Sequence, residues 1–501
     1  MEQRGGMSGN GVAHPNEPIS IARCIAYWAA KAPDAAALTD EQATLSYAEL
    51  DGVTNRLARV YADAGVGEGD YVTIAVPNGN GLLLAACAAW KIGAIPHPIS
   101  YRMPAAERTA MLDLVKPRLI VGEYCDGDPA GTTHIGGDFK ADPTISDAAL
   151  PDRVSPHWKA ISSGGSTGRP KIIVAKPPGL FDPRTPYRGT QLSGVQLVAG
   201  PLYHNAPFML AVRGLFAGQH IVVMPRFDAE RVLALIERYR VNYVMMVPTM
   251  MLRISRLPED VRARYDMSSL ETVIHCAAPC PAWLKREWIE WLGASVVQEL
   301  YGGTEGCGAT WIDGQEWLER PGSVGRAMTG YKIRVKTETG EDAAPGEIGD
   351  IYMMPEAGPA TSYFYLGGTS HRDAQGWEWI GDMGHLDEDG YLFLADRRTD
   401  LIISGGANIY PAEVEAAIDA FEGVRTSVVI GLPDDDLGAV VHAIVEPADI
   451  DPDALMAHLN ERLVRYKVPR SIELVAGPLR DEAGKARRAA LRAERIQRKI
   501  G

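Results

Sequence analysis

A ten-residue segment from Ser162 to Lys171, SSGGSTGRPK, combines glycines, hydroxyl side chains and a lysine. Glycines let successive backbone N–H groups turn toward one anion, hydroxyls add donors, and Lys171 adds a positive charge. Hydrogen bonds to charged groups contribute about 1.5–3 kcal/mol each, so five or six of them would hold a triphosphate. The segment therefore predicts a phosphate-binding loop. Its expected ligands are Ser162, Ser163, Gly164, Gly165, Ser166, Thr167, Gly168 and Lys171.

This loop differs from the Walker type, in which Gly-Lys-Ser/Thr runs directly into a helix. Here Pro170 precedes the lysine, and the next residues, IleIleValAla, are typical of a strand. We therefore expect a strand–loop–strand cradle. The alternative is a flexible surface linker, but a linker has no use for ArgProLys before a β-forming run.

Together with five further motifs in the same order, the loop resembles the signature of the acyl-adenylate-forming superfamily, which includes acyl-CoA synthetases, adenylation domains of peptide synthetases, and firefly luciferase. The resemblance extends over nearly the whole chain, from about residue 18 to 496. It implies that Mg-ATP activates a carboxylic acid to an acyl-adenylate and that a thiol then accepts the acyl group. Coenzyme A is the expected acceptor, because no carrier-protein domain follows. ATP, Mg²⁺ and coenzyme A are thus the implied cofactor set.

The resemblance also implies the roles of individual residues. TyrGlyGlyThrGluGly at 301–306 would end a strand in a turn, with Thr304 on the α-phosphate and Glu305 on Mg²⁺, a cation that prefers oxygen ligands. Asp382 would accept hydrogen bonds from the ribose. Besides the loop, the implied nucleotide-binding residues are Ala277, Ala278, Pro279, Tyr301, Gly302, Thr304, Asp382 and Arg397.

The implied catalytic residues are Lys485, Thr304 and His204. Lys485 would lie between the substrate carboxylate and the α-phosphate, where a cation lowers the repulsion of two anions. His204 would border the carboxylate without acting as a general base. The implied acyl pocket consists of His204, Pro248, Ala277 and Gly302. The implied coenzyme A loop consists of Gly405, Gly406 and Ala407, which would reach the site after a rotation of the C-terminal domain near Thr399.

Alternating strand-like and helix-like runs must position these residues. Short β-branched runs at 71–76, 118–121, 220–224, 241–247 and 272–275 alternate with helix-length runs at 82–92 and 229–239, which indicates βαβ units and parallel sheets. After Thr304, short strands with Gly-rich turns predict an antiparallel or barrel-like part. We expect an α/β fold with a flexible tail at 1–17, an adenylating domain of two parallel-rich subdomains and the barrel-like part at 18–397, and a mobile α+β domain at 398–501.

Whole-chain properties exclude several partners. The chain has 501 residues and a formal charge of 50 − 64 = −14, which argues against nucleic acid or an anionic membrane as a main partner. The longest apolar run, 82–90, is half the length of a membrane span, so no integral membrane segment is expected.

Six scattered cysteines predict a reducing cytoplasm. His275, Cys276 and Cys280 have no second ligand pair, which argues against zinc. Small molecules are the expected partners, and a homodimer is an open alternative.

The acid itself is less well specified. The form of the loop and the stretch ThrProTyrArgGlyThrGlnLeuSer at 185–193 resemble bile-acid and long-chain or steroid-side-chain ligases, so we expect a bulky hydrophobic carboxylate. Aryl acids, as in benzoate or coumarate ligases, are the alternative. Two other classes are a luciferase-like oxygenase and an inactive nucleotide-binding protein. The presence of Lys171, Glu305, Asp382 and Lys485 argues against the inactive protein.

Overall fold

The computed structural model describes residues 17–125, 128–129, 131–163, 171–185, 194–434, 436–481 and 484–500. Its N-terminal part contains a four-stranded parallel sheet in the order β5-β4-β6-β7. The strands are β4 (Tyr71–Ala75), β5 (Ile95–Pro98), β6 (Leu119–Gly122) and β7 (Thr133–Ile135), with helices α2 (Tyr47–Asp63), α3 (Asn80–Lys91) and α4 (Ala105–Val115). A capping box between Ser46 and Glu49 fixes the start of α2.

A second, much larger sheet begins with parallel strands in the order β2-β12-β11-β13-β14-β15, with β3 (Thr44–Ser46) antiparallel at its edge. These strands are β2 (Ala36–Thr39), β11 (Val195–Val198), β12 (His220–Val223), β13 (Tyr243–Met246), β14 (Thr272–His275) and β15 (Val297–Gly302). Helices α1 (Ile21–Lys31), α5 (Asn205–Phe216), α6 (Ala229–Tyr239), α7 (Pro248–Ser255), α8 (Glu259–Arg262) and α9 (Ala282–Leu292) accompany this part. The predicted βαβ organisation is confirmed, and the helix expected at 229–239 matches α6.

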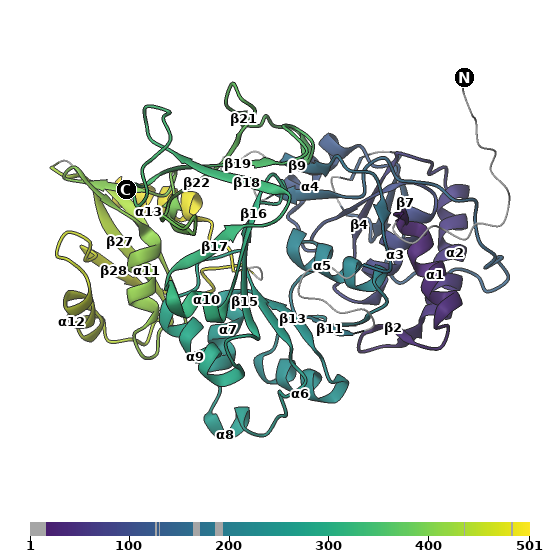
Figure 1. Cartoon of the computed structure of the whole chain (residues 1–501), viewed down its shortest axis with the longest axis horizontal. Helices are drawn as coiled ribbons and strands as arrows, with labels where there is room; N and C mark the ends of the chain where they lie inside the picture. The colour runs from purple at the N-terminus through teal and green to yellow at the C-terminus, as the bar shows by residue number, and fades with distance from the viewer. Residues whose placement is uncertain are drawn as a thin grey trace.

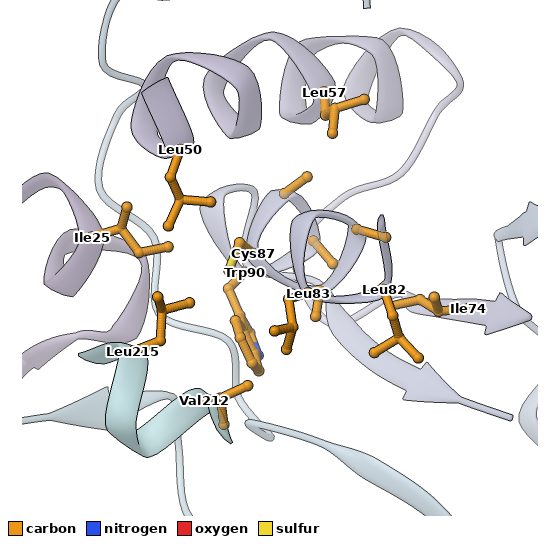
Figure 2. Packing of buried hydrophobic residues seen from close by; sticks show 14 of the residues in the cluster. Ile25, Leu50, Leu57, Ile74, Leu82, Leu83, Cys87, Trp90, Val212 and Leu215 are labelled. Atoms are coloured by element: carbon orange, nitrogen blue, oxygen red, sulfur yellow. The ribbon is translucent and has the colours of Figure 1, made fainter. Parts of the chain in front are cut away.

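Helix α3 connects the two parallel sheets through its apolar surface. Trp90 is 1% exposed and packs among α1, α2 and α5, as Figure 2 shows with Leu50, Val212 and Leu215. Burying an aromatic side chain of this size contributes about 1.5–3 kcal/mol. The predicted run 82–92 is therefore a core helix.

The antiparallel part expected after Thr304 continues the large sheet by hydrogen bonding, in the order β15-β16-β17-β23-β22-β19-β18. It comprises β16 (Ala309–Asp313), β17 (Ser323–Ala327), β18 (Tyr331–Lys336), β19 (Gly349–Pro355), β21 (His371–Arg372), β22 (Glu378–Leu386) and β23 (Leu392–Arg397), with α10 (Gly314–Glu319). A separate sheet in the order β20-β9-β8 contains β8 (Ala160–Ser163), β9 (Lys171–Ala175) and β20 (Tyr363–Leu366). Strands β1 (Ile19–Ser20) and β10 (Leu180–Phe181) pair near the start of the described chain.

A small α+β unit follows β23 and has its own apolar clusters. It contains a β24–β25 hairpin (Ile402–Ser404, Ala407–Ile409), a sheet of β26 (Thr426–Asp434), β27 (Gly438–Glu446) and β28 (Ser471–Leu474), and helices α11 (Pro411–Asp419), α12 (Pro452–Arg462) and α13 (Arg488–Ile500). This unit and the N-terminal helices lie at opposite ends of the molecule (Figure 1). No helix in the described ranges is long and apolar enough for a membrane span.

Candidate functional site

The site forms where parallel strands of the large sheet reach their carboxyl ends. Strands β11, β13, β14 and β15 are parallel neighbours, so the segments that follow them emerge at one edge. Ligands of open α/β sheets bind at such an edge. The segments that follow contain the predicted residues His204, Pro248, Ala277, Ala278, Pro279 and Thr304. The fold thus brings residues far apart in sequence to one edge.

The predicted phosphate loop lies between two strands, as the sequence indicates. Strands β8 and β9 are antiparallel neighbours with Ser163 opposite Lys171. Gly164, Gly165, Ser166, Thr167 and Gly168 lie outside the described residues. The Ser162 hydroxyl lies 3.0 Å from His97 Nε2, and His97 Nδ1 lies 3.0 Å from the Thr73 hydroxyl. Burial lowers the pKa of His97 to about 3, so this imidazole is neutral and orients the start of the loop without adding charge.

Glu305, the predicted metal ligand, lies next to Lys171 at the end of the phosphate loop. Its Oε1 accepts a hydrogen bond of 2.6 Å from the Tyr365 hydroxyl and lies 3.9 Å from Lys171 Nζ. Lys171 Nζ also donates to the Tyr365 hydroxyl at 3.1 Å and lies over its ring. Among the described residues, no hydrogen bond reaches Oε2 of Glu305. That oxygen fits a Mg²⁺ ion, which commonly takes one or two protein carboxylates and completes its shell with phosphate oxygens and water.

Tyr301, Asp382 and Arg397 belong to three strands of the large sheet, β15, β22 and β23. Asp382 and Arg397 are directly opposite each other in the β22–β23 pair. The Tyr301 hydroxyl, from β15, donates to Asp382 Oδ2 at 2.8 Å. A ring and a carboxylate joined in this way can contact a base and its ribose at the same time. Gly302, the last residue of β15, follows the ring directly.

Ala277 forms a strained wall after β14. Its φ is +73°, a left-handed conformation that costs a residue with a Cβ about 1–2 kcal/mol. Ala277 is exposed, as is Gly302 on the neighbouring strand. The two residues therefore present backbone and one methyl group rather than bulky side chains. A flat ring can approach such a wall closely.

The loop that carries Lys485 docks against the start of α7. Gly484 has a φ of +75°, and a Cβ on it would lie 3.1 Å from the Thr249 hydroxyl and 3.5 Å from Val247. Burial and the nearby Lys485 ammonium lower the pKa of His204 to about 4. Lys485 also lies close enough to Cys276 to influence its thiol. The cation from the C-terminal unit thus reaches the edge formed by β11, β13 and β14. Helix α13 begins three residues after Lys485 and leaves Lys485 in a loop.

Gly405 and Gly406 form the two-residue turn of the β24–β25 hairpin, with Ser404 opposite Ala407. Their φ angles of +56° and +84° are those of a tight hairpin turn. The Gly405 N–H donates to the Leu437 carbonyl at 2.9 Å. The described contacts of this predicted coenzyme A loop are therefore within the C-terminal unit, and the structure does not bring it to the strand ends.

Lys159 is a buried cation that the sequence reasoning missed. It precedes β8, is 6% exposed, and donates to Oδ1 of Asn205, the residue after His204. Burial and the nearby Arg213 guanidinium lower its pKa to about 7, against the opposing effect of Glu305. Among the described residues, no carboxylate lies within ion-pairing distance of it. His97 and Tyr365 were missed as well, because each acts through a partner distant in sequence.

The residues weighed for zinc lie beneath the wall instead. His275 is fully buried and lies 3.8 Å from Glu299, which pairs with Lys285 at 2.6 Å. Burial raises the pKa values of the Cys276 and Cys280 thiols, so both are protonated at neutral pH. The neutral thiols of Cys276 and Cys280 and the Lys285–Glu299 ion pair therefore support the segment that contains Ala277.

The family comparisons agree with this geometry. Residues 25–364 match the AMP-binding enzyme family, and residues 413–485 match the AMP-binding enzyme C-terminal domain. A feruloyl-CoA synthase of Amycolatopsis is 34% identical over 88% of this chain and 92% of its own. The long-chain-fatty-acid–CoA ligase FadD13 of Mycobacterium tuberculosis is 29% identical over 89% and 92%.

Among solved structures, one similar protein is the O-succinylbenzoate coenzyme A synthetase of Bacillus subtilis in complex with ATP and magnesium ion. It has a TM-score of 0.79 and 25% identity, and the match covers 95% of this chain and 99% of that one. Both units of the present fold are therefore included in the match.

We expect Lys159→Met to raise the melting temperature, and to raise it more at pH 6 than at pH 9. The folded amine is protonated below its pKa of about 7, so the cost of the buried charge is fully present at pH 6. In the unfolded chain the Lys159 amine stays protonated up to its ordinary pKa of 10.5. The free-energy cost of burying Lys159 therefore falls as the pH rises from about 7 to 10.5. One pKa unit corresponds to about 1.4 kcal/mol, and the gain should differ by on the order of 2 °C between the two conditions. Differential scanning calorimetry measures it.

Lys176→Met is the matched control, because Lys176 is exposed one residue after β9. Its effect on the melting temperature should be the same at both pH values. An equal effect of Lys159→Met at both pH values would contradict the buried, proton-releasing amine.

Proposed function

Because the chain belongs to the AMP-binding enzyme family, we propose that its site activates an aromatic carboxylic acid and passes it to coenzyme A. The chain is an AMP-forming acyl-CoA synthetase, with ATP and coenzyme A as its substrates. The acid and the roles of individual residues are the proposal. The observation that carries it is the 34% identity with a feruloyl-CoA synthase over 88% of the chain.

The wall at Ala277 and Gly302 supports a planar acid. Both residues are exposed at the ends of neighbouring strands and lack bulk. A flat ring gains contact area on such a surface, whereas a flexible chain loses conformational entropy to lie on it. A long-chain or steroid-like acid is the second candidate, favoured by the similarity to FadD13. The stretch 186–193, part of the basis for the steroid-like prediction, lies outside the described residues.

In the adenylation step, the acid's carboxylate attacks the α-phosphate and pyrophosphate leaves. Tyr301 contacts the adenine, and Asp382 and Arg397 contact the ribose. The Lys485 ammonium lies between the carboxylate and the α-phosphate, where it offsets their repulsion. His204 is neutral near pH 7, so it borders the carboxylate without competing for its charge.

At the other end of the triphosphate, Lys171 and the loop before it bind the departing pyrophosphate, and Thr304 donates to the α-phosphate. Glu305 would bind Mg²⁺ through Oε2, and the ion would supply charge neutralisation at the phosphate oxygens. For the thiol step, the C-terminal unit turns near Thr399, so that Gly405–Ala407 replaces the Lys485 loop. The free state of all six cysteines, two of them only partly buried, supports a cytoplasmic location. A homodimer stays a prediction.

The acid is tested by pyrophosphate release across a panel of benzoate, ferulate, octanoate, palmitate and cholate, with and without coenzyme A. We expect kcat/KM for an aromatic acid to exceed that for palmitate by at least about tenfold, because a pocket of the wrong shape loses a few kcal/mol of contact. The matched measurement without coenzyme A separates activation from transfer. A maximum at palmitate or cholate would reject the aromatic proposal in favour of the second candidate.

We expect Lys485→Ala to lower pyrophosphate release by about 10²–10³-fold, the loss seen when one charge-stabilising group is removed from a reaction centre. Formation of acyl-CoA from supplied acyl-adenylate should change by less than about threefold, because Lys485 is absent from the thiol pose. Arg487→Ala is the control, since the Arg487 side chain is exposed and, among the described residues, forms an ion pair with Glu107 at the surface. Equal loss of both half-reactions in Lys485→Ala would remove the lysine from its proposed role.

A further inference from the structure

Arg480 anchors the loop that carries Lys485. Its Nη1 donates to the Gly484 carbonyl at 3.2 Å, and its Nη2 donates to Glu415 Oε2 at 2.9 Å and to the Ser427 carbonyl at 2.8 Å. Arg480 also pairs through its backbone with Ala486, so the loop is closed on both sides of Lys485. One guanidinium thereby joins the loop to the strand β26 and the helix α11.

Glu415 connects this anchor to a second arginine. The carboxylate is 6% exposed and accepts two hydrogen bonds from Arg488 Nη2, at 2.6 and 2.7 Å, and one from the Val429 N–H at 2.8 Å. Arg488 Nη1 in turn donates to Asp400 at 3.2 Å. A continuous set of charged contacts therefore runs from Asp400, next to Thr399, to the Gly484 carbonyl.

The contacts of Arg480, Glu415 and Arg488 fix the geometry of the loop more than they stabilise the fold. Buried ion pairs contribute little net stability over apolar packing, but they fix geometry, because each lone pair must find a donor. A planar guanidinium can donate to the carboxylate, the Ser427 carbonyl and the Gly484 carbonyl together, whereas a single ammonium cannot span all three. The geometry therefore sets the distance between the rigid C-terminal sheet and Lys485.

We propose that Arg480 is a positioning residue for adenylation, holding the Lys485 loop rigid while Glu415 and Arg488 tie the same network to the segment beside Thr399. The proposal rests on the role of Lys485 given above. Arg480 touches no substrate and acts through the loop. Its loss should therefore impair the half-reaction that uses Lys485 and spare the one that does not.

The experiment compares Arg480→Lys with Arg495→Lys in the full chain. Arg495 is the matched control, because it makes a two-point pair with Glu473 in the same unit and has no contact with the described residues of the loop. Its side chain is 9% exposed, against 13% for Arg480. With the best acid of the panel, Arg480→Lys should lower pyrophosphate release at least about tenfold and leave acyl-CoA formation from supplied acyl-adenylate within about twofold. Arg495→Lys should leave the ratio of the two rates unchanged.

Amide hydrogen exchange of residues 484–487 provides a readout that needs no substrate. Arg480→Lys should speed exchange in this segment and leave β26 and β27 unchanged, which also shows that the unit remains folded. Unchanged exchange, or equal loss of both half-reactions with the unit folded, would overturn the proposal. Failure of the aromatic proposal would instead appear in the wild-type panel, without any effect on the exchange comparison.

Discussion

The contact between Gly484 and the start of α7 is the constraint on which the site depends. In the proposed reaction a nucleotide and an acid bind at the strand ends, and both bring negative charge to the same edge. The Lys485 ammonium would relieve this repulsion, and the loop that carries it comes from the C-terminal unit and packs against Thr249 and Val247. A Cβ at residue 484 would crowd the Thr249 hydroxyl, and the φ of +75° already favours glycine there. Close approach of the two units thus depends on a residue without a side chain.

The electrostatic arrangement around this contact follows from burial. Burial lowers the pKa values of His97, His204 and Lys159, so the two imidazoles are neutral and the amine carries less charge at neutral pH. In the proposed reaction, Lys171 and Lys485 face the two ends of the triphosphate. An acidic chain with a formal charge of −14 can therefore bind an anion, because the local field of the site differs from the net charge.

Local sequence predicted the elements well where local chemistry determines them. The strands around Ser162–Lys171 and the helix at Ala229–Tyr239 follow from glycine, β-branched and amphipathic patterns that act over a few residues. The resemblance implied separate nucleotide contacts for Asp382 and Arg397, and only the β22–β23 register shows that the two residues lie opposite each other. Lys159, Tyr365 and the Arg480 network could not be predicted, since their partners lie 46, 60 and 65 residues away and only the folded chain brings them together. The identity of the acid could not be predicted from the sequence for the same reason, because the wall proposed to contact it, at Ala277 and Gly302, combines residues from different strand ends.

The central claim is that the docked position of the Lys485 loop serves adenylation alone. Glu107 and Arg487 form an ion pair of 3.6 Å between α4 and this loop. Cysteines placed at these two positions can therefore be joined by a short bis-maleimide. The partly buried Cys125 and Cys280 are replaced by serine in the same protein, so that they do not react with the linker. The account predicts that the cross-linked protein keeps acid-dependent ATP–pyrophosphate exchange and loses acyl-CoA formation, while the same variant without the linker performs both. Acyl-CoA formation by the cross-linked protein at the rate of the unlinked variant would contradict it.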